Sequence, residues 1–283
     1  MFVIIGFVVV LGSVLGGFAL EGGHLLVLMQ WAEFVIIGGS ATGALLVSTP
    51  PAILKKIVQA TLGAIKGKGT SKESYLSVLK LLFDLLTKGQ KEGWIALEKH
   101  IENPAESPVF TAYPDLMQNS TLICFITDTF RMVIMGGISA HDLEALMEAD
   151  IETQFHDGKK PGMIIQKIGD ALPGLGIVAA VLGIIITMGA INGPADEIGH
   201  KVGAALVGTF LGILISYGFL QPLATNIDLN AEKELVIFEV LKHAITGFAK
   251  GLRPILCVEF ARRSIPTEVR PDFEEMESFV KGK

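Results

Sequence analysis

Four stretches of the chain contain no Asp, Glu, Lys or Arg and consist mainly of apolar residues. They are Met1–Leu20, Phe34–Leu54, Ala171–Ala195 and Val202–Ile227. Each contains at least the ~20 residues that an α-helix needs to cross a hydrocarbon core of ~30 Å. Only 18% of the 283 residues are charged, against roughly 25% in soluble globular domains. The sequence therefore predicts a polytopic membrane protein with four transmembrane helices.

Basic residues are concentrated in two parts of the chain. Of the 23 Lys and Arg residues, 13 lie in Lys55–Asp170 and 9 in Asp228–Lys283, and the remaining one is Lys201. Because Lys and Arg next to membrane spans favour the cytoplasmic side, we predict that both segments and both termini are cytoplasmic. The predicted domains are transmembrane helices 1 and 2 with a short periplasmic loop (1–54), a cytoplasmic insert (55–170), transmembrane helices 3 and 4 (171–227) and a cytoplasmic C-terminal tail (228–283).

The cytoplasmic insert has the periodicity of α-helices. Apolar residues recur at helical spacing over Ser71–Ile101 and again over Leu116–Met135. Gly93 is expected to weaken or break the first run, and Gly136-Gly137 to end the second. No segment shows the alternating pattern of a strand, so the predicted fold class is all-α.

A further helix of the insert is predicted to begin at Ser139, because Asp142 follows three residues later, as in a capping box. We expect it to continue to Asp150. After Asp157-Gly158, Pro161 suits the first position of another helix, which then runs into the third span.

The third and fourth spans carry small or hydroxyl residues at helical intervals. Those of the third span are Gly176, Ala180, Gly183 and Thr187, and those of the fourth are Ala205, Thr209, Gly212 and Ser216. Two interpretations stay open. The faces allow close helix packing, or they form a polar path lined by Thr187, Thr209 and Ser216. Pro173 and Pro222, near the inner ends of these spans, free backbone carbonyls and can mark hinges.

No predicted span contains an ionisable side chain. Glu21, His24 and Glu33 lie at the outer ends of the first two spans, where we expect solvated loop residues. Ion and proton pathways in membranes are built on buried Asp, Glu, His or Arg. The sequence therefore argues against a self-sufficient proton pump, and predicts that a partner supplies the titrating group if the chain moves ions.

Enzyme, cofactor, metal and nucleic-acid functions find no support in the sequence. The formal net charge is −6, and no basic stripe of the kind that binds nucleic acid is present. Gly67-Lys68 resembles a phosphate loop, but Leu62 and Gly69 occupy the positions where that motif needs Gly and Ser or Thr. Zinc-binding His-Glu-x-x-His and nucleophile-elbow motifs are absent from the sequence. We predict a protein that is not an enzyme, with no catalytic residues, no cofactor and no metal.

Several stretches of the chain resemble the MotA subunits of flagellar stators. They are Ala32–Gly39, Ile101–Pro104, Tyr113-Pro114, Leu143–Met147, Ile151–Thr153 and, above all, Pro173–Ala180. The last motif is shared with the wider MotA/TolQ/ExbB proton channel family. ExbB and TolQ proteins have three spans and an outside N-terminus, so the four predicted spans favour the MotA branch.

The resemblance implies a function and partners. MotA-like subunits lie in the bacterial inner membrane as multi-pass proteins, where lipids surround them. They form a ring of five around two copies of a MotB-like subunit, whose single membrane helix carries an ion-binding Asp. Ion passage converts the ion-motive force into torque, and the cytoplasmic inserts push the rotor protein FliG. An ExbB/TolQ-like energiser of outer-membrane processes is the alternative, and a structural scaffold without an ion path is a third possibility.

The resemblance also assigns residues. Pro173 and Pro222 match the family prolines that couple ion flow to motion. Glu98 matches a family charge at the rotor interface. Gln90 stands where the best-known members carry Arg, and Lys88 and Lys91 flank it as substitutes for that charge.

The coupling ion is predicted to be the proton. Sodium-type relatives commonly carry Thr at the position that matches Ala180, which has no side-chain oxygen. Thr209 on the facing span is then the main polar neighbour of the partner's Asp. A desolvated sodium ion needs several oxygen ligands, whereas a proton needs only the carboxylate and a water or hydroxyl path.

Overall fold

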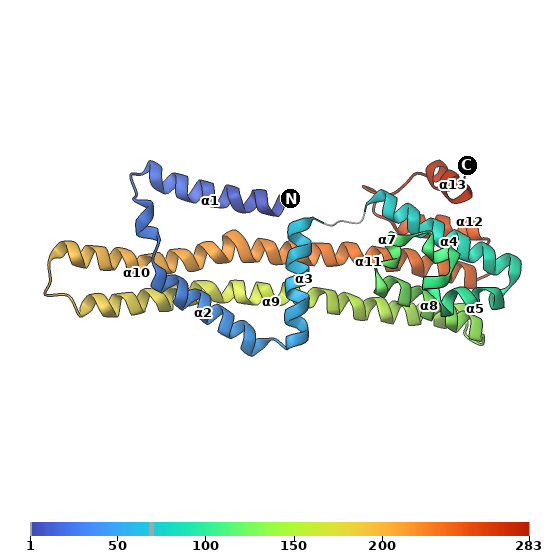
Figure 1. Cartoon of the computed structure of the whole chain (residues 1–283), viewed down its shortest axis with the longest axis horizontal. Helices are drawn as coiled ribbons and strands as arrows, with labels where there is room; N and C mark the ends of the chain where they lie inside the picture. Colours follow the sequence, from blue (N-terminus) through green and yellow to red (C-terminus); the bar gives the residue numbers. More distant parts are fainter. Residues whose placement is uncertain (1, 68–70, 283) are drawn as a thin grey trace. The chain divides into compact units, whose positions relative to one another are not determined.

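Residues 2–67 and 71–282 are described by a computed structural model, and all regular elements within these ranges are helical (Figure 1). The prediction of an all-α fold is therefore confirmed. The chain forms two compact units, which are described separately. Unit 1 contains Met1–Lys68 and Gly158–Asn230, and unit 2 contains Gly69–Asp157 and Ala231–Lys283.

Unit 1 contains the apolar helices. Its elements are α1 (Phe2–Leu20), η1 (Leu25–Leu28), α2 (Trp31–Ser48), α3 (Pro51–Lys66), the second part of α9 (Ala140–Met188), α10 (Ala195–Ile215), the π-helical turn η3 (Ser216–Leu220) and the first part of α11 (Gln221–Ala249). Four segments are long and apolar enough to cross a membrane, namely Phe2–Leu20, Leu25–Ser48, Ala140–Met188 and Ala195–Ala249. The prediction of four transmembrane helices is confirmed.

The second span is shorter at its C-terminal end than the uncharged stretch Phe34–Leu54 predicts. Helix α2 ends at Ser48, Thr49 is extended, and α3 begins at Pro51. A proline disfavours the helical conformation of the residue before it, so Pro50 and Pro51 together enforce the break. Helix α3 then buries Ile57 and Ala64 against α9 and α11.

Helix α9 is continuous from Ala140 to Met188, with Pro161 in its interior. The prediction that a new helix starts at Pro161, after a break at Asp157-Gly158, is therefore wrong. An interior proline removes one backbone hydrogen bond, but apolar residues on both sides of it are buried. Ile151 packs into the core of unit 2 and Ile165 into that of unit 1, and these contacts offset the loss.

Unit 2 is built around a core of large apolar side chains. Its elements are α4 (Lys72–Glu92), α5 (Trp94–Glu102), η2 (Pro104–Glu106), α6 (Pro108–Thr111), α7 (Pro114–Met117), α8 (Ser120–Met135), the remaining parts of α9 and α11, α12 (Pro254–Ser264) and α13 (Phe273–Lys281). Helix α4 alone contributes Leu79, Leu82, Leu85 and Leu86, none of which is exposed.

The predicted helix breaks of the insert lie where backbone geometry requires glycine. Gly93, between α4 and α5, has a φ of +83°, and Gly136, after α8, has a φ of +72°. Residues with a Cβ are strained at such angles. Ser139 accepts a hydrogen bond from the Asp142 N–H at 3.1 Å, which confirms the predicted start of the next helix.

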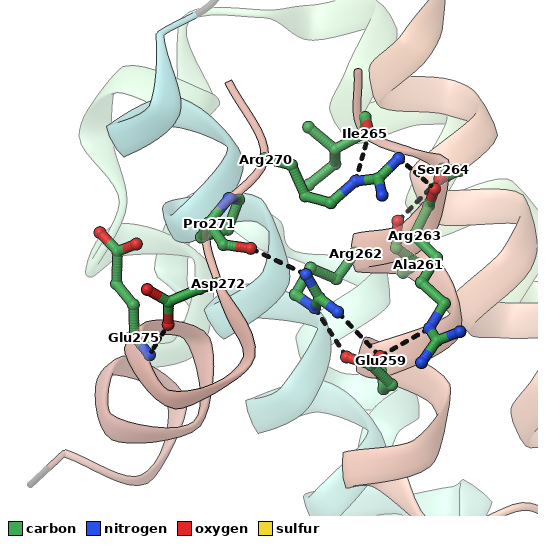
Figure 2. A network of polar contacts seen from close by, with 10 residues as sticks. All are labelled: Glu259, Ala261, Arg262, Arg263, Ser264, Ile265, Arg270, Pro271, Asp272 and Glu275. Atoms are coloured by element: carbon green, nitrogen blue, oxygen red, sulfur yellow. Dashed lines mark hydrogen bonds and ion pairs between the residues drawn. The ribbon is translucent and has the colours of Figure 1, made fainter. Parts of the chain in front are cut away.

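An arginine network fixes the segment between α12 and α13 (Figure 2). Arg262 donates through Nε and Nη2 to Glu259, at 2.7 and 2.9 Å, and through Nη1 to the carbonyl oxygen of Pro271 at 2.9 Å. Hydrogen bonds from Arg262 and then Arg263 hold the pKa of the Glu259 carboxyl below its usual range. The guanidinium thus ties the end of α12 to the linker that precedes α13.

Helix α13 closes the core of unit 2. Asp272 caps it by accepting a hydrogen bond from the Glu275 N–H at 2.7 Å (Figure 2). Its Met276 and Val280 are buried in the core to which α4 contributes, and Lys72 of α4 pairs with Glu275 at 2.5 Å. Helix α13 is therefore a packed part of unit 2.

Candidate functional site

The small-residue faces predicted for the third and fourth spans meet each other in unit 1. A methyl group on Gly176 of α9 would lie 2.7 Å from the carbonyl oxygen of Gly208, and one on Gly183 would lie 2.6 Å from Ala205 Cβ. A methyl group on Gly212 of α10 would lie 2.6 Å from the carbonyl oxygen of Leu172. We call this contact the α9–α10 seam. At these positions the small residues allow the two backbones to approach closely.

The seam also contains Ala180 and Thr209, which the sequence assigns to the ion path. A methyl group on Gly208 would lie 3.2 Å from the backbone nitrogen of Ala180, and Thr209 is the next residue of α10. Both side chains are half-buried. The backbones of α9 and α10 are therefore close at these positions, and the assignment of Ala180 and Thr209 to the ion path stays a prediction.

Thr187 does not present a free hydroxyl to the seam. Its side chain is only 4% exposed, and its Oγ1 donates to the carbonyl oxygen of Gly183 at 2.8 Å. A hydroxyl that bonds the preceding turn of its own helix is satisfied locally. The Thr187 hydroxyl, which the sequence assigns to the polar path, is therefore hydrogen-bonded to the backbone of its own helix.

Pro173 leaves one carbonyl of α9 without its helical donor, and Ser216, the first residue of η3 after α10, supplies a replacement. In a regular helix the carbonyl of Gly169 would accept from the N–H of residue 173, which proline lacks. The hydroxyl of Ser216, whose side chain is fully buried, donates to this Gly169 oxygen at 2.6 Å. A hydrogen bond across 47 positions therefore ties the proline site of α9 to the end of α10.

The second predicted hinge, Pro222, adjoins the same contact. Immediately before it, η3 is wound as a π-helix in which the Gln221 N–H donates to the Ser216 carbonyl oxygen. The Gln221 side chain donates through Nε2 to Ser216 Oγ at 3.2 Å and to Asp170 Oδ1 at 3.0 Å. Single π-helical turns often occur at functional sites. Gly169, Ser216, Gln221 and Asp170 form what we call the proline junction, which links Pro173 to the residue before Pro222.

Glu33 is buried, so the prediction that it is a solvated loop residue is wrong. It lies in the first turn of α2, inside the candidate span Leu25–Ser48, and is 7% exposed. A methyl group on Gly208 would lie 2.5 Å from its Oε2. Glu33 precedes the buried Ile37 by four residues and so shares its helix face. That spacing was the signal available in the sequence.

The predicted rotor-contact residues lie on α4 and α5 of unit 2. Lys88 is half-buried, while Lys91 and Glu98 are exposed. Lys88 lies close enough to His100 of α5 to contribute, after burial, to lowering the pKa of that imidazole. The turn at Gly93 joins the two helices and so places both lysines and Glu98 on neighbouring elements.

Glu98 borders a hollow of about 200 Å³ on unit 2. The hollow is lined by Glu98, Ile101, Glu102, Arg131, Ile134 and Met135. Arg131 pairs with Asp128 at 2.6 Å rather than with Glu98. Among the residues with described positions, neither Lys88 nor Lys91 nor Glu98 forms an ion pair, so all three charges are available to a partner.

Comparison with known proteins identifies the family. The family model for the motility protein A N-terminal region matches residues 4–93, and the MotA/TolQ/ExbB proton channel family matches residues 118–239. Motility protein A of Salmonella typhimurium is 37% identical over 282 residues, which cover 100% of this chain and 96% of that protein. The chain belongs to the motility protein A family. Chemotaxis protein LafT of Vibrio parahaemolyticus is 38% identical over 276 residues, 98% of this chain and 97% of that protein.

Two solved structures share the fold. The Campylobacter jejuni MotAB structure superposes with a TM-score of 0.76 at 22% identity, covering 94% of this chain and 96% of that chain. The flagellar MotAB stator complex of Bacillus subtilis superposes with a TM-score of 0.74, at the same identity and coverage. The fold of these structures therefore extends over both units of this chain.

Proposed function

We propose that this chain is a stator subunit of a bacterial flagellar motor, which converts an ion-motive force into torque on the rotor. The observation that carries the proposal is the similarity to motility protein A over the whole chain, spans and insert alike. The match of residues 4–93 to the motility protein A N-terminal model favours this function over an ExbB/TolQ-like energiser.

The partner in this proposal is a MotB-like subunit whose single membrane helix carries an ion-binding Asp. The two solved complexes that share the fold contain MotB beside MotA by their names. Helix α1 has no buried residue, so its apolar surface needs lipid or a neighbouring copy of the chain. A ring of five copies around the partner, in the inner membrane with both termini in the cytoplasm, satisfies this need.

The proline junction is where ion binding would be converted into motion. Ion binding at the partner's Asp changes the charge that faces the α9–α10 seam near Ala180 and Thr209. Pro173 lacks an N–H, so the Gly169 carbonyl has lost the regular helical bond from residue 173 and accepts a hydrogen bond from the Ser216 hydroxyl. A helix held by a side-chain hydrogen bond can bend at this point at lower cost than a regular helix.

The insert delivers the movement to the rotor protein FliG. Lys88, Lys91 and Glu98 carry charges that no described residue of this chain pairs. Unpaired surface charges add little to folding, but they can steer a charged partner toward the surface and fix how the two proteins align. Gln90 is exposed and uncharged, so Lys88 and Lys91 supply the positive charge at the C-terminal end of α4.

Swimming tests the function directly. This chain and its MotB-like partner, expressed in a bacterium that lacks stators but has the matching rotor, should restore swimming. The same cells without the partner are the control and should not swim. Assembly with the partner in the membrane without any restored rotation would contradict the stator function.

The coupling ion is tested in the same cells. Because Ala180 offers no side-chain oxygen, we expect swimming to continue in sodium-free medium at fixed pH and to stop when a protonophore is added. Swimming that stops without sodium and survives the protonophore would overturn the proton assignment and leave the stator function intact.

A further inference from the structure

Glu33 is a carboxylate buried against the centre of the α9–α10 seam. Its side chain is 7% exposed, and its Oε2 has no hydrogen-bond partner among residues 2–67 and 71–282. The space it fills exists because Gly208 has no side chain. A methyl group there would lie 2.5 Å from Oε2, 3.0 Å from Ala179 Cβ and 3.2 Å from the Ala180 nitrogen.

The carboxylate lies against α9 and α10 at positions away from the ends of these two helices. Ala180 lies eight residues before the end of α9 at Met188, which corresponds to about 12 Å along the helix axis. Glu33 thus meets α9 near Ala180 and α10 beside Thr209, the two residues assigned to the ion path. A carboxylate in this position is costly unless it is protonated or faces water or a cation.

We propose that Glu33 is a proton-binding carboxylate of this chain, which operates in series with the partner's Asp. The inference rests on the proposed function and extends it. A proton from water on the outer side adds to the Glu33 carboxylate and forms the neutral acid. The acid then returns the proton to water that hydrates the partner's Asp, and Glu33 becomes a carboxylate again.

This assignment explains why the seam combines Gly208 with a buried acid. Small residues alone would serve helix packing, as Gly176 and Gly183 do. Gly208 serves packing against Ala179 as well, but it also makes room for an ionisable group whose Oε2 has no described donor, which packing alone does not require. Buried ionisable residues in membrane spans are characteristic of ion pathways.

The experiment measures proton flux through the complex of this chain and its MotB-like partner in liposomes. Glu33→Gln keeps the size of the side chain and removes the titrating group, so we expect proton flux to fall about tenfold or more. Glu21→Gln is the matched control, because Glu21 is an exposed acid at the outer end of α1. The control should retain at least about half of the flux, since a solvated acid can be replaced by water in proton transfer.

A chemical probe gives a second, independent measurement. Dicyclohexylcarbodiimide reacts with protonated carboxyl groups in apolar surroundings, so it should modify Glu33 and spare Glu21 in the wild-type complex. Mass spectrometry of the digested chain identifies the modified residue. This measurement uses the wild-type protein, so it tests the role of Glu33 even if Glu33→Gln does not assemble. An unmodified Glu33 overturns the proposal.

The outcomes separate the inference from the function on which it rests. A wild-type complex that carries flux, together with unchanged flux in Glu33→Gln, overturns the role of Glu33 alone. A wild-type complex with no proton flux overturns the proposed proton channel and the role of Glu33 with it. Loss of flux in Glu33→Gln, with normal flux in Glu21→Gln and labelling of Glu33, supports both.

Discussion

The two units of this protein are packed through side chains of opposite size. Unit 2 places large apolar side chains inside, and Leu79, Leu82 and Phe130 are not exposed at all. Unit 1 places glycine and alanine where α9 and α10 meet, while Ile177, Val178 and Ile185 of α9 point outward and are at least half exposed. In water, burial of large apolar side chains drives folding. In lipid that gain is missing, so close backbone contact between small residues takes its place.

The largest expected effect comes from enlarging a residue of the seam. Gly176→Val should abolish assembly and swimming, because even one methyl group would lie 2.7 Å from the Gly208 carbonyl oxygen. Gly174→Val is the matched control, since nothing lies within 4 Å of a methyl group at that position of the same helix. Co-purification with the partner and swimming speed are measured. Equal behaviour of the two variants would remove the distinction between seam and outer face.

Next in size is the loss of rotation when the proline junction is altered. Pro173→Ala supplies an N–H to the Gly169 carbonyl and stiffens α9, so we expect normal recruitment of the partner with little or no swimming. Ser216→Ala leaves the buried Gly169 carbonyl without its donor, which costs about 1–3 kcal/mol of stability.

A double-mutant cycle sharpens this test. In Pro173→Ala the backbone N–H already serves the Gly169 carbonyl, so adding Ser216→Ala should cost less stability than it does in the wild type. Thermal unfolding of the purified membrane complex gives the two differences. Strictly additive losses, or normal swimming of Pro173→Ala, would contradict the role of the junction.

In unit 2 the damaging change should be the truncation of a buried side chain, whereas in unit 1 it is the enlargement of a small residue. Leu82→Ala removes a side chain that is not exposed, and we expect it to lower the free energy of unfolding by about 2–5 kcal/mol. Ile95→Ala on α5 is the control, because Ile95 is 79% exposed. Protein level and thermal unfolding are measured. A Leu82→Ala variant as stable as Ile95→Ala would show that this core does not hold unit 2 together.

The smallest effect on folding is expected at the surface of unit 2. Lys88→Glu with Lys91→Glu, and separately Glu98→Lys, should leave protein level and membrane assembly normal, since no described residue pairs these charges. Swimming should nevertheless be impaired, and a compensating charge reversal on the rotor should partly restore it. Unimpaired swimming of both variants would show that these residues do not contact the rotor.

Residues that act through local chemistry were predictable. The breaks at Gly93 and Gly136 follow from positive φ angles that glycine adopts without strain, and the start at Ser139 follows from its cap. Interruptions that depend on competing contacts were not. Pro161 lies within a continuous helix, because apolar residues on both sides of it are buried. The end of the second span at Pro50-Pro51, six residues before the uncharged stretch ends, is by contrast a local effect of the prolines.

The candidate site divides in the same way. The sequence singled out Pro173, Ala180, Thr209 and Pro222 without showing what each one contacts. Thr187 has the expected hydroxyl, but its own helix occupies it. Glu33 lies outside the uncharged stretches. Its spacing from Ile37 puts it on the same face of α2, but only the packing of α2 against α10 shows what covers it.

The sequence by itself determined the number of spans, the asymmetry of basic residues and the family, because hydropathy, charge and motif are properties of contiguous residues. Only the tertiary structure decided which residues meet. Ser216 reaches the Gly169 carbonyl across 47 positions, and Glu33 fills the space left by Gly208. Such contacts depend on the register between helices that are distant in the chain. Register is set by how whole faces fit together, which no single stretch of sequence specifies.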